Sequence, residues 1–296
     1  MNGEHLSKLT LEISKLIESS HFICSSIEAL SNFALDNIAQ MIELGSSFYT
    51  NIVIQVDMLG DHNIKRIYID KNNPRVIQTL PCTNDYISGT TESLYKCVEW
   101  AINSYPAENY ALFIWNHGSG PIDPAIWGKA SRDRDLIYNE RTALVEINRK
   151  KSKGTAFNDT YQTYLTNPEQ KITLDRISKN LLGGQKLALI IHDACLQASI
   201  EVASESKNAA KIMVASEEIE LASGFNYKTA LTKVTQEPLT PEAFAEQIVL
   251  AYQKEYKNRF ADFTLSSIDL SKLEELENNV SDVATALIML LGTPEG

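Results

Sequence analysis

Residues Lys186–Cys195 read KLALIIHDAC, an apolar run that ends in four residues of mixed chemistry. The run Lys186–Ile191 is short and almost wholly apolar, which is typical of a strand with both faces buried. Strands of this kind belong to parallel sheets that helices cover on both sides. Because ligands of such sheets bind beyond the carboxyl ends of the strands, we expect His192–Cys195 to lie at a binding site.

The rest of the chain alternates short apolar segments with amphipathic ones. Further strands are expected at Asn51–Met58, Arg66–Asp70, Arg75–Leu80, Asn109–Trp115, Lys211–Ala215 and Thr264–Asp269. Helices are expected at Ser26–Leu44, Thr91–Ser104, Thr173–Asn180, Gln197–Asn208, Pro241–Tyr256 and Ser271–Leu291. This alternation predicts an α/β fold with a mostly parallel central sheet and helices on both faces.

Two segments depart from the alternation. Residues 1–26 carry leucine and isoleucine at helical spacing, so we expect an N-terminal helical segment there, either a prosegment or an extension, and no first strand. Residues 27–296 are expected to form one domain. Within this domain, residues 121–156 are rich in arginine and lysine and poor in apolar periodicity. We therefore expect a long basic loop, and loops of this length are usually functional or disordered.

The composition excludes several classes of protein. The 296-residue chain has a net charge of −11, and an acidic surface disfavours nucleic-acid binding. No apolar run reaches the roughly 18 residues of a membrane span. The N-terminus lacks the pattern of a signal peptide, so we expect a cytoplasmic protein or export by a non-classical route. The chain has 4 cysteines, which are too few for a disulfide scaffold, so we expect one of them to be a functional thiol. We also expect a monomer.

Two of the expected strands end in residues that can perform chemistry. His117 follows Asn109–Trp115, and Cys195 follows Lys186–Ile191. If these strands are neighbours, the imidazole and the thiol face one another, which is the minimum for a thiol nucleophile with a proton-transfer partner. The backbone N–H groups of Gly118 and Cys195 are then the candidate oxyanion donors.

Cys195 is the favoured nucleophile among the cysteines. It precedes a helix expected to begin near Gln197, and a helix N-terminus lowers the pKa of a thiol. The other three are expected in a helical connection (Cys24), in a loop (Cys82) and within a helix (Cys97). Cys195 is therefore the candidate catalytic residue.

Other chemistries have less support. Ser119 lacks the glycine two positions earlier that a nucleophile elbow requires. His117, His192 and Cys195 are zinc-ligand types, but no two ligand-type residues stand at helical i, i+4 spacing, and we expect no metal site. The sequence also lacks the glycine-rich loops of nucleotide-binding proteins.

Two longer segments carry a resemblance to a known family. Tyr105–Gly120 reads YPAENYALFIWNHGSG, and Asp193–Ala203 reads DACLQASIEVA. Both resemble the clostripain family of cysteine peptidases, which belongs to the caspase-like clan. Further similarity is found at Asn51–Asp57, Phe157–Thr160 and Ser266–Lys272. The resemblance extends over about residues 33–290, nearly the whole chain.

The resemblance implies a caspase-like α/β/α sandwich and a peptidase with a dyad of Cys195 and His117. Cys195 would attack the scissile carbonyl, and His117 would protonate the leaving amine. Members of the family often cut after arginine or lysine, and they mature by cleaving themselves after a basic residue between the histidine and the cysteine. The implied sites of self-cleavage here are Arg149, Lys150 and Lys151.

The resemblance also implies an S1 pocket with two acidic residues. Asp193 keeps the first, but Ser223 stands where the family has its second aspartate. An arginine in the pocket would lose one charge-assisted hydrogen bond, typically worth about 1.5–3 kcal/mol. A basic P1 preference is therefore open, and Glu217, Glu218 and Glu220 are the nearby acids that would compensate.

These observations leave three hypotheses for function. The first is an active cysteine endopeptidase with a protein or peptide substrate. The second is a catalytically silent caspase-like module that binds a partner through the same groove. The third is an acyl transferase that uses the same dyad. We expect no cofactor; calcium stays open because some relatives respond to it, although the sequence holds no Asp-x-Asp-x-Asp loop.

Overall fold

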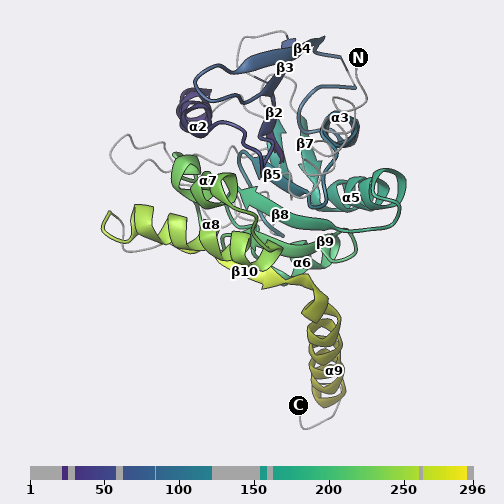
Figure 1. Cartoon of the computed structure of the whole chain (residues 1–296). Coiled ribbons are helices and arrows are strands. Elements are labelled where there is room, and N and C mark those ends of the chain that lie inside the picture. Colours follow the sequence, from purple (N-terminus) through teal and green to yellow (C-terminus); the bar gives the residue numbers. More distant parts are fainter. Residues whose placement is uncertain are drawn as a thin grey trace, which may run out of the picture.

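The computed structural model describes residues 22–25, 31–57, 63–83, 85–121, 154–158, 163–259 and 263–291. Its centre is a five-stranded sheet in the order β1-β5-β8-β9-β10 (Figure 1). The strands are β1 (Phe22–Ser25), β5 (Ala111–Trp115), β8 (Leu187–Asp193), β9 (Ala210–Ala215) and β10 (Ser266–Asp269). The first four run parallel, and β10 pairs antiparallel with β9. The central sheet is therefore mostly parallel.

Helices cover both faces of this sheet (Figure 1). One face carries α2 (Ser31–Leu44), α7 (Tyr227–Gln236) and α8 (Pro241–Tyr256). The other carries α3 (Thr91–Ser104), α5 (Asn167–Leu181) and the short α6 (Ile200–Ser206). Along β5 the buried side chains alternate between the two cores, as the pleat of a strand requires.

Two smaller sheets accompany the central one. An antiparallel sheet contains β2 (Val53–Val56), β3 (Asn63–Tyr68) and β4 (Arg75–Pro81). A two-stranded antiparallel sheet contains β6 (Gly154–Asn158) and β7 (Thr163–Thr166). After the 3-10 turn η1 (Leu270–Lys272), α9 (Leu273–Leu291) extends away from the body (Figure 1). In the part of the chain that the structure describes, no helix is long and apolar enough to cross a membrane.

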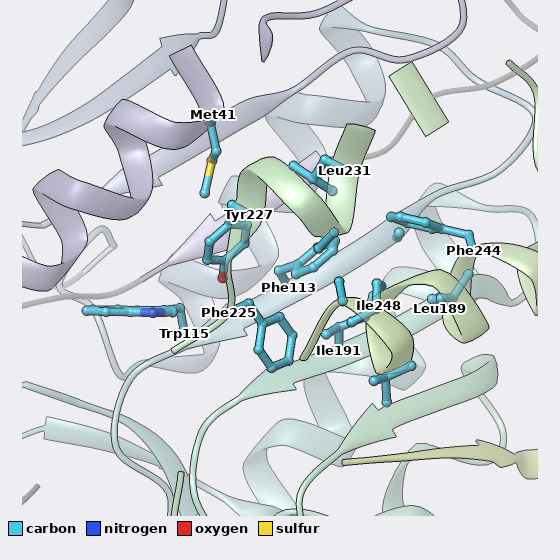
Figure 2. Close-up of a cluster of buried hydrophobic side chains, with 14 of the residues drawn as sticks. Met41, Phe113, Trp115, Leu189, Ile191, Phe225, Tyr227, Leu231, Phe244 and Ile248 are labelled. Carbon is cyan, nitrogen blue, oxygen red and sulfur yellow. The ribbon is translucent and has the colours of Figure 1, made fainter. Parts of the chain in front are cut away.

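The core between the sheet and α2, α7 and α8 is rich in aromatic side chains (Figure 2). Phe113 on β5 lies 6.0 Å from the ring of Tyr227 and 6.3 Å from that of Phe244, measured between centroids. Leu189 and Ile191 on β8 belong to the same cluster. The strand that precedes His117 and the strand that precedes Cys195 are thus held by one packed core.

The prediction of a helical N-terminus without a first strand is wrong for Phe22–Ser25. These residues form β1 and pair in parallel with β5, with Ser25 opposite Trp115. Cys24 consequently lies in a strand. Four residues are too few to show the alternating hydrophobic pattern of a strand, and the helical spacing of the preceding residues favoured a helix instead. Residues 1–21 lie outside the described residues.

Other boundaries differ near the site. The basic loop expected over residues 121–156 ends earlier, because β6 begins at Gly154; residues 122–153 lie outside the described residues. The helix expected from Gln197 begins only at Ile200, where Ser199 caps it through the N–H of Val202. A serine cap three residues before an apolar position sets this start.

Replacing Phe113 by alanine should lower the free energy of unfolding by about 3–5 kcal/mol, because the ring is fully buried and its loss leaves a cavity. Urea denaturation followed by circular dichroism measures the change. Phe48→Ala is the matched control, since Phe48 is 49% exposed and should cost under about 1 kcal/mol. Equal losses in the two variants would contradict the packing described.

Candidate active site

The two chemically active strand ends lie side by side. β5 and β8 are neighbours, with Trp115 opposite Asp193. The N–H of Asn116 donates to the carbonyl of Asp193 at 3.3 Å, so the pairing continues past the end of β5. His117 and Cys195 therefore leave the sheet at the same edge, as expected from two parallel strands.

The loops after these strands are in backbone contact. A Cβ atom placed on Gly118 would lie 2.3 Å from the carbonyl oxygen of Cys195 and 2.6 Å from the side-chain nitrogen of Gln197. Gly120 has a positive φ of 57°, and its Cβ would lie 2.3 Å from the carbonyl oxygen of Leu196. Only glycine permits this approach. The glycines beside His117 thus bring its loop against the cysteine.

A small pocket of about 20 Å³ lies at this edge, enough for about one water molecule. Its lining includes Trp115, His117, Asp193, Cys195, Glu220 and Gly224. The structure therefore brings together the two proposed dyad residues and one of the two S1 residues. It adds Glu220 from the segment between β9 and α7.

The thiol of Cys195 is held by the backbone of Glu220. The backbone N–H of Glu220 donates a hydrogen bond to Sγ at 3.3 Å. The thiol in turn donates to the backbone carbonyl oxygen of Glu220, which lies 3.8 Å from Sγ. Burial, followed by the nearby Glu220 carboxyl, raises the pKa of the Cys195 thiol to about 12. In this conformation the thiol is protonated at neutral pH.

The helix predicted to lower the thiol pKa does not act on Cys195. Since α6 begins at Ile200 and has only 7 residues, its N-terminus does not start at the cysteine. Instead, Leu196 adopts a left-handed φ of 62° and turns the chain back. Its N–H donates to the Glu218 carbonyl at 3.1 Å, and the N–H of Ala198 donates to that of Ser216 at 2.9 Å. The cysteine loop is thereby joined to the segment that carries Glu220.

Asp193 lines the pocket and is 4% exposed. Its carboxylate accepts from the Tyr227 hydroxyl at 2.8 Å and from the Phe225 N–H at 3.2 Å. A Cβ atom on Gly224 would lie 2.7 Å from both carboxylate oxygens, so the glycine makes room for the acid. Burial raises the pKa of Asp193 to about 6, although these hydrogen bonds oppose the shift.

Of the three acids that the sequence left open, Glu220 is the one in the pocket. It is only 4% exposed. Burial and then the neighbouring Asp193 carboxyl raise its pKa well above the usual value. Glu217 and Glu218 are exposed.

The remaining predicted residues are placed differently. Ser223 pairs its hydroxyl with that of Tyr256 at 2.8 Å and is not part of the pocket lining. His192 lies within β8, fully buried, and burial lowers its pKa to about 4, so the imidazole is neutral. Among the described residues, no group of three or more His, Cys, Asp or Glu could hold a metal ion.

Arg149, Lys150 and Lys151 lie outside the described residues. The described chain on either side of that segment meets beside the site. Gly118 and Thr155 form an antiparallel bridge, and the Thr155 hydroxyl donates to the His117 carbonyl at 3.4 Å. Described residues on both sides of that segment therefore lie next to the histidine.

Comparisons with known proteins identify a family and several similar folds. The model of the clostripain family, peptidase family C11, matches residues 21–292. No curated protein matches the chain significantly. An inactive zymogen C11 protease from Parabacteroides distasonis is similar in fold, with a TM-score of 0.62 and 19% identity. That similarity covers 88% of this chain and 64% of the other, so this chain spans less than two thirds of it.

Two structures of a secreted C11 cysteine protease from Bacteroides thetaiotaomicron are also similar. One holds an irreversible peptide inhibitor; it has a TM-score of 0.65 and 20% identity over 90% of this chain and 71% of the other. The second has a TM-score of 0.64 and 15% identity over 91% and 72%. At these identities the likeness concerns the fold.

The resting thiol should alkylate slowly. At pH 8 we expect iodoacetamide to label Cys195 at least about 100-fold more slowly than half-buried Cys82, because the raised pKa leaves little thiolate. The rate at Cys195 should rise about tenfold per pH unit between pH 7 and 9, since both pH values lie below its pKa. Peptide-level mass spectrometry measures both cysteines in one sample. Similar rates at the two sites would show that the Glu220 contacts do not form in solution.

Proposed function

Because the chain belongs to the clostripain family, we propose that it is a cysteine endopeptidase that works through a dyad of Cys195 and His117. One observation carries this proposal: both residues line one pocket at the carboxyl ends of two adjacent parallel strands. This is where α/β sheets place their reacting groups. A protein or peptide is the substrate, in keeping with the peptide inhibitor bound to one of the similar structures.

The dyad would act by covalent catalysis. The Cys195 thiol passes its proton to His117, and Sγ forms a bond to the scissile carbonyl carbon. His117 returns the proton to the leaving amine as the peptide bond breaks. Water then hydrolyses the thioester and restores the thiol. The backbone N–H groups of Gly118 and Cys195 are the proposed donors to the developing oxyanion.

The structure has the features of a resting form of such an enzyme. The pocket has room for one water molecule rather than a side chain. The thiol is protonated and bound to the backbone of Glu220. Substrate binding would therefore require the segment Ser216–Gly224 to shift, and that shift would also release Sγ.

We propose cleavage after a basic P1 residue. The Asp193 carboxyl in the pocket lining would accept hydrogen bonds from an arginine or lysine side chain. Two buried carboxyls are costly on their own, and His117 of the dyad is the only basic side chain in the described lining. A P1 cation would offset that cost.

We also propose self-processing after Arg149, Lys150 or Lys151. These residues precede Gly154, the first residue of β6, by three to five positions. Thr155 is bridged to Gly118 beside the dyad, so the described chain at both ends of the segment is close to the nucleophile. One of the similar structures is an inactive zymogen, and processing at this segment would convert the resting form into the active one.

A silent module that binds a partner through the same groove is the second candidate. The observation that favours it is the resting state itself, with a closed pocket and a thiol whose pKa is about 12. In a silent module that state would be permanent. The next two experiments separate the candidates.

Wild-type protein should split on incubation within residues 128–157, whereas Cys195→Ala should stay intact, because the cleavage needs the thiol nucleophile. Intact-mass spectrometry of both proteins side by side measures the split, and the fragment masses give the P1 residue. The variant with Arg149, Lys150 and Lys151 all changed to alanine should lose this cut. Splitting of Cys195→Ala at the same rate would show that another protease is responsible.

Cys195→Ala and His117→Ala should each reduce kcat/KM on a basic peptide substrate by at least about 10³-fold, because they act as one unit. The double variant should be no worse than either single variant. Steady-state fluorogenic assays measure all three. If the loss of kcat/KM in the double variant equals the product of the two single losses, the two residues do not share one step.

A further inference from the structure

A pair of adjacent buried carboxyls requires an explanation. Glu220 is 4% exposed, and its carboxyl interacts with that of Asp193, which is also 4% exposed. Buried charged groups in proteins are almost always paired with a group of opposite charge, because an ionised carboxyl is costly to remove from water. A pair of acids at this position therefore indicates a cationic ligand that arrives from outside.

The position of Glu220 is fixed by its own backbone. Its N–H donates to Sγ of Cys195, so the residue is anchored at the nucleophile. Its side chain lines the same pocket as Asp193. The ionisable groups around the two carboxyls are the thiol of Cys195, the hydroxyls of Tyr227, Tyr252 and Tyr256, and the imidazole of His117, which lines the same pocket. Apart from the dyad imidazole, none of these groups can carry a positive charge.

The neighbouring acids and Ser223 do not occupy this position. Glu217 accepts a hydrogen bond from Ser266 at the surface, and the side chain of Glu218 is exposed. The Ser223 hydroxyl is engaged with Tyr256, whose own hydroxyl donates to the Gly224 carbonyl at 2.5 Å. Among the residues that the structure describes, only Glu220 adds a second carboxyl to the pocket that Asp193 lines.

Resting on the function proposed above, we propose that Glu220 is the second acidic residue of the S1 pocket, in place of Ser223, and that it selects a guanidinium or ammonium side chain at P1. The acid comes from three positions earlier in the same segment. Its backbone is bound to Sγ of the nucleophile, whereas the Asp193 carboxylate is held by Tyr227 and Phe225.

A pH dependence follows from two neighbouring buried carboxyls. Without a ligand they favour sharing a proton, which agrees with the raised pKa of Asp193, about 6, and of Glu220. A cation favours the ionised forms, so its binding releases a proton. KM for a basic P1 residue should therefore rise as the pH falls through about 6, whereas KM for a neutral P1 residue should not.

The test compares Glu220→Gln with the matched control Glu218→Gln. Glutamine keeps the size of the side chain and the backbone contacts to Cys195 while removing the charge. Substrates differ only at P1, which is arginine, lysine or citrulline, the last being a neutral analogue of arginine. Glu220→Gln should lower the ratio of kcat/KM for arginine or lysine to kcat/KM for citrulline at least about 10-fold, mainly through KM. Glu218→Gln should leave all three substrates unchanged.

A ratio of arginine to citrulline that stays within twofold in Glu220→Gln would overturn the inference, with the peptidase proposal intact. Absence of hydrolysis of every substrate by the processed wild type, together with no labelling of Cys195 by a peptidyl electrophile with P1 arginine, would overturn both. If Glu220→Gln fails to fold, the test uses wild-type protein and measures KM for the arginine and citrulline substrates at pH 7 and pH 5. An arginine-to-citrulline KM ratio that rises between pH 7 and pH 5 supports the inference, and a constant ratio overturns it.

Discussion

The parallel pairing of β5 with β8 is the constraint on which the site depends. With Trp115 opposite Asp193, the residues that follow both strands must leave the sheet at one edge. The aromatic core around Phe113 fixes the depth of these strands, and the absence of a side chain at Gly118 lets the two loops touch. His117 and Cys195 are adjacent because the sheet is parallel, and no direct interaction between their side chains is needed to bring them there.

A second constraint is the segment between β9 and α7. It binds the cysteine loop through backbone hydrogen bonds at Ser216 and Glu218, and it binds Sγ through Glu220. The same segment provides Gly224, which leaves space for the Asp193 carboxyl. One piece of chain thus determines both the ionisation of the nucleophile and the shape of the pocket. A substitution that moves the backbone of this segment is expected to change reactivity and specificity together.

Much of the fold was predictable because it depends on local pattern. The apolar strands on either side of the site, the helix Thr91–Ser104 and the helix Pro241–Tyr256 have strong periodicity, and the structure has the last two with the same bounds. β1 was missed because four residues show no period, and α6 was placed too early because Leu196 turns the chain with a positive φ. Such a φ in leucine is stabilised by tertiary contacts, which no sequence window contains.

The sequence alone does not identify which glutamate lies in the pocket beside Asp193. Three glutamates lie within four residues of one another, and their order along the chain says nothing about which one faces inward. The structure separates them by the direction of the backbone, because both the N–H and the C=O of Glu220 are directed at Sγ. If Glu220 binds the P1 cation as proposed, specificity and the state of the nucleophile depend on one residue, because its backbone binds Sγ while its side chain lines the pocket.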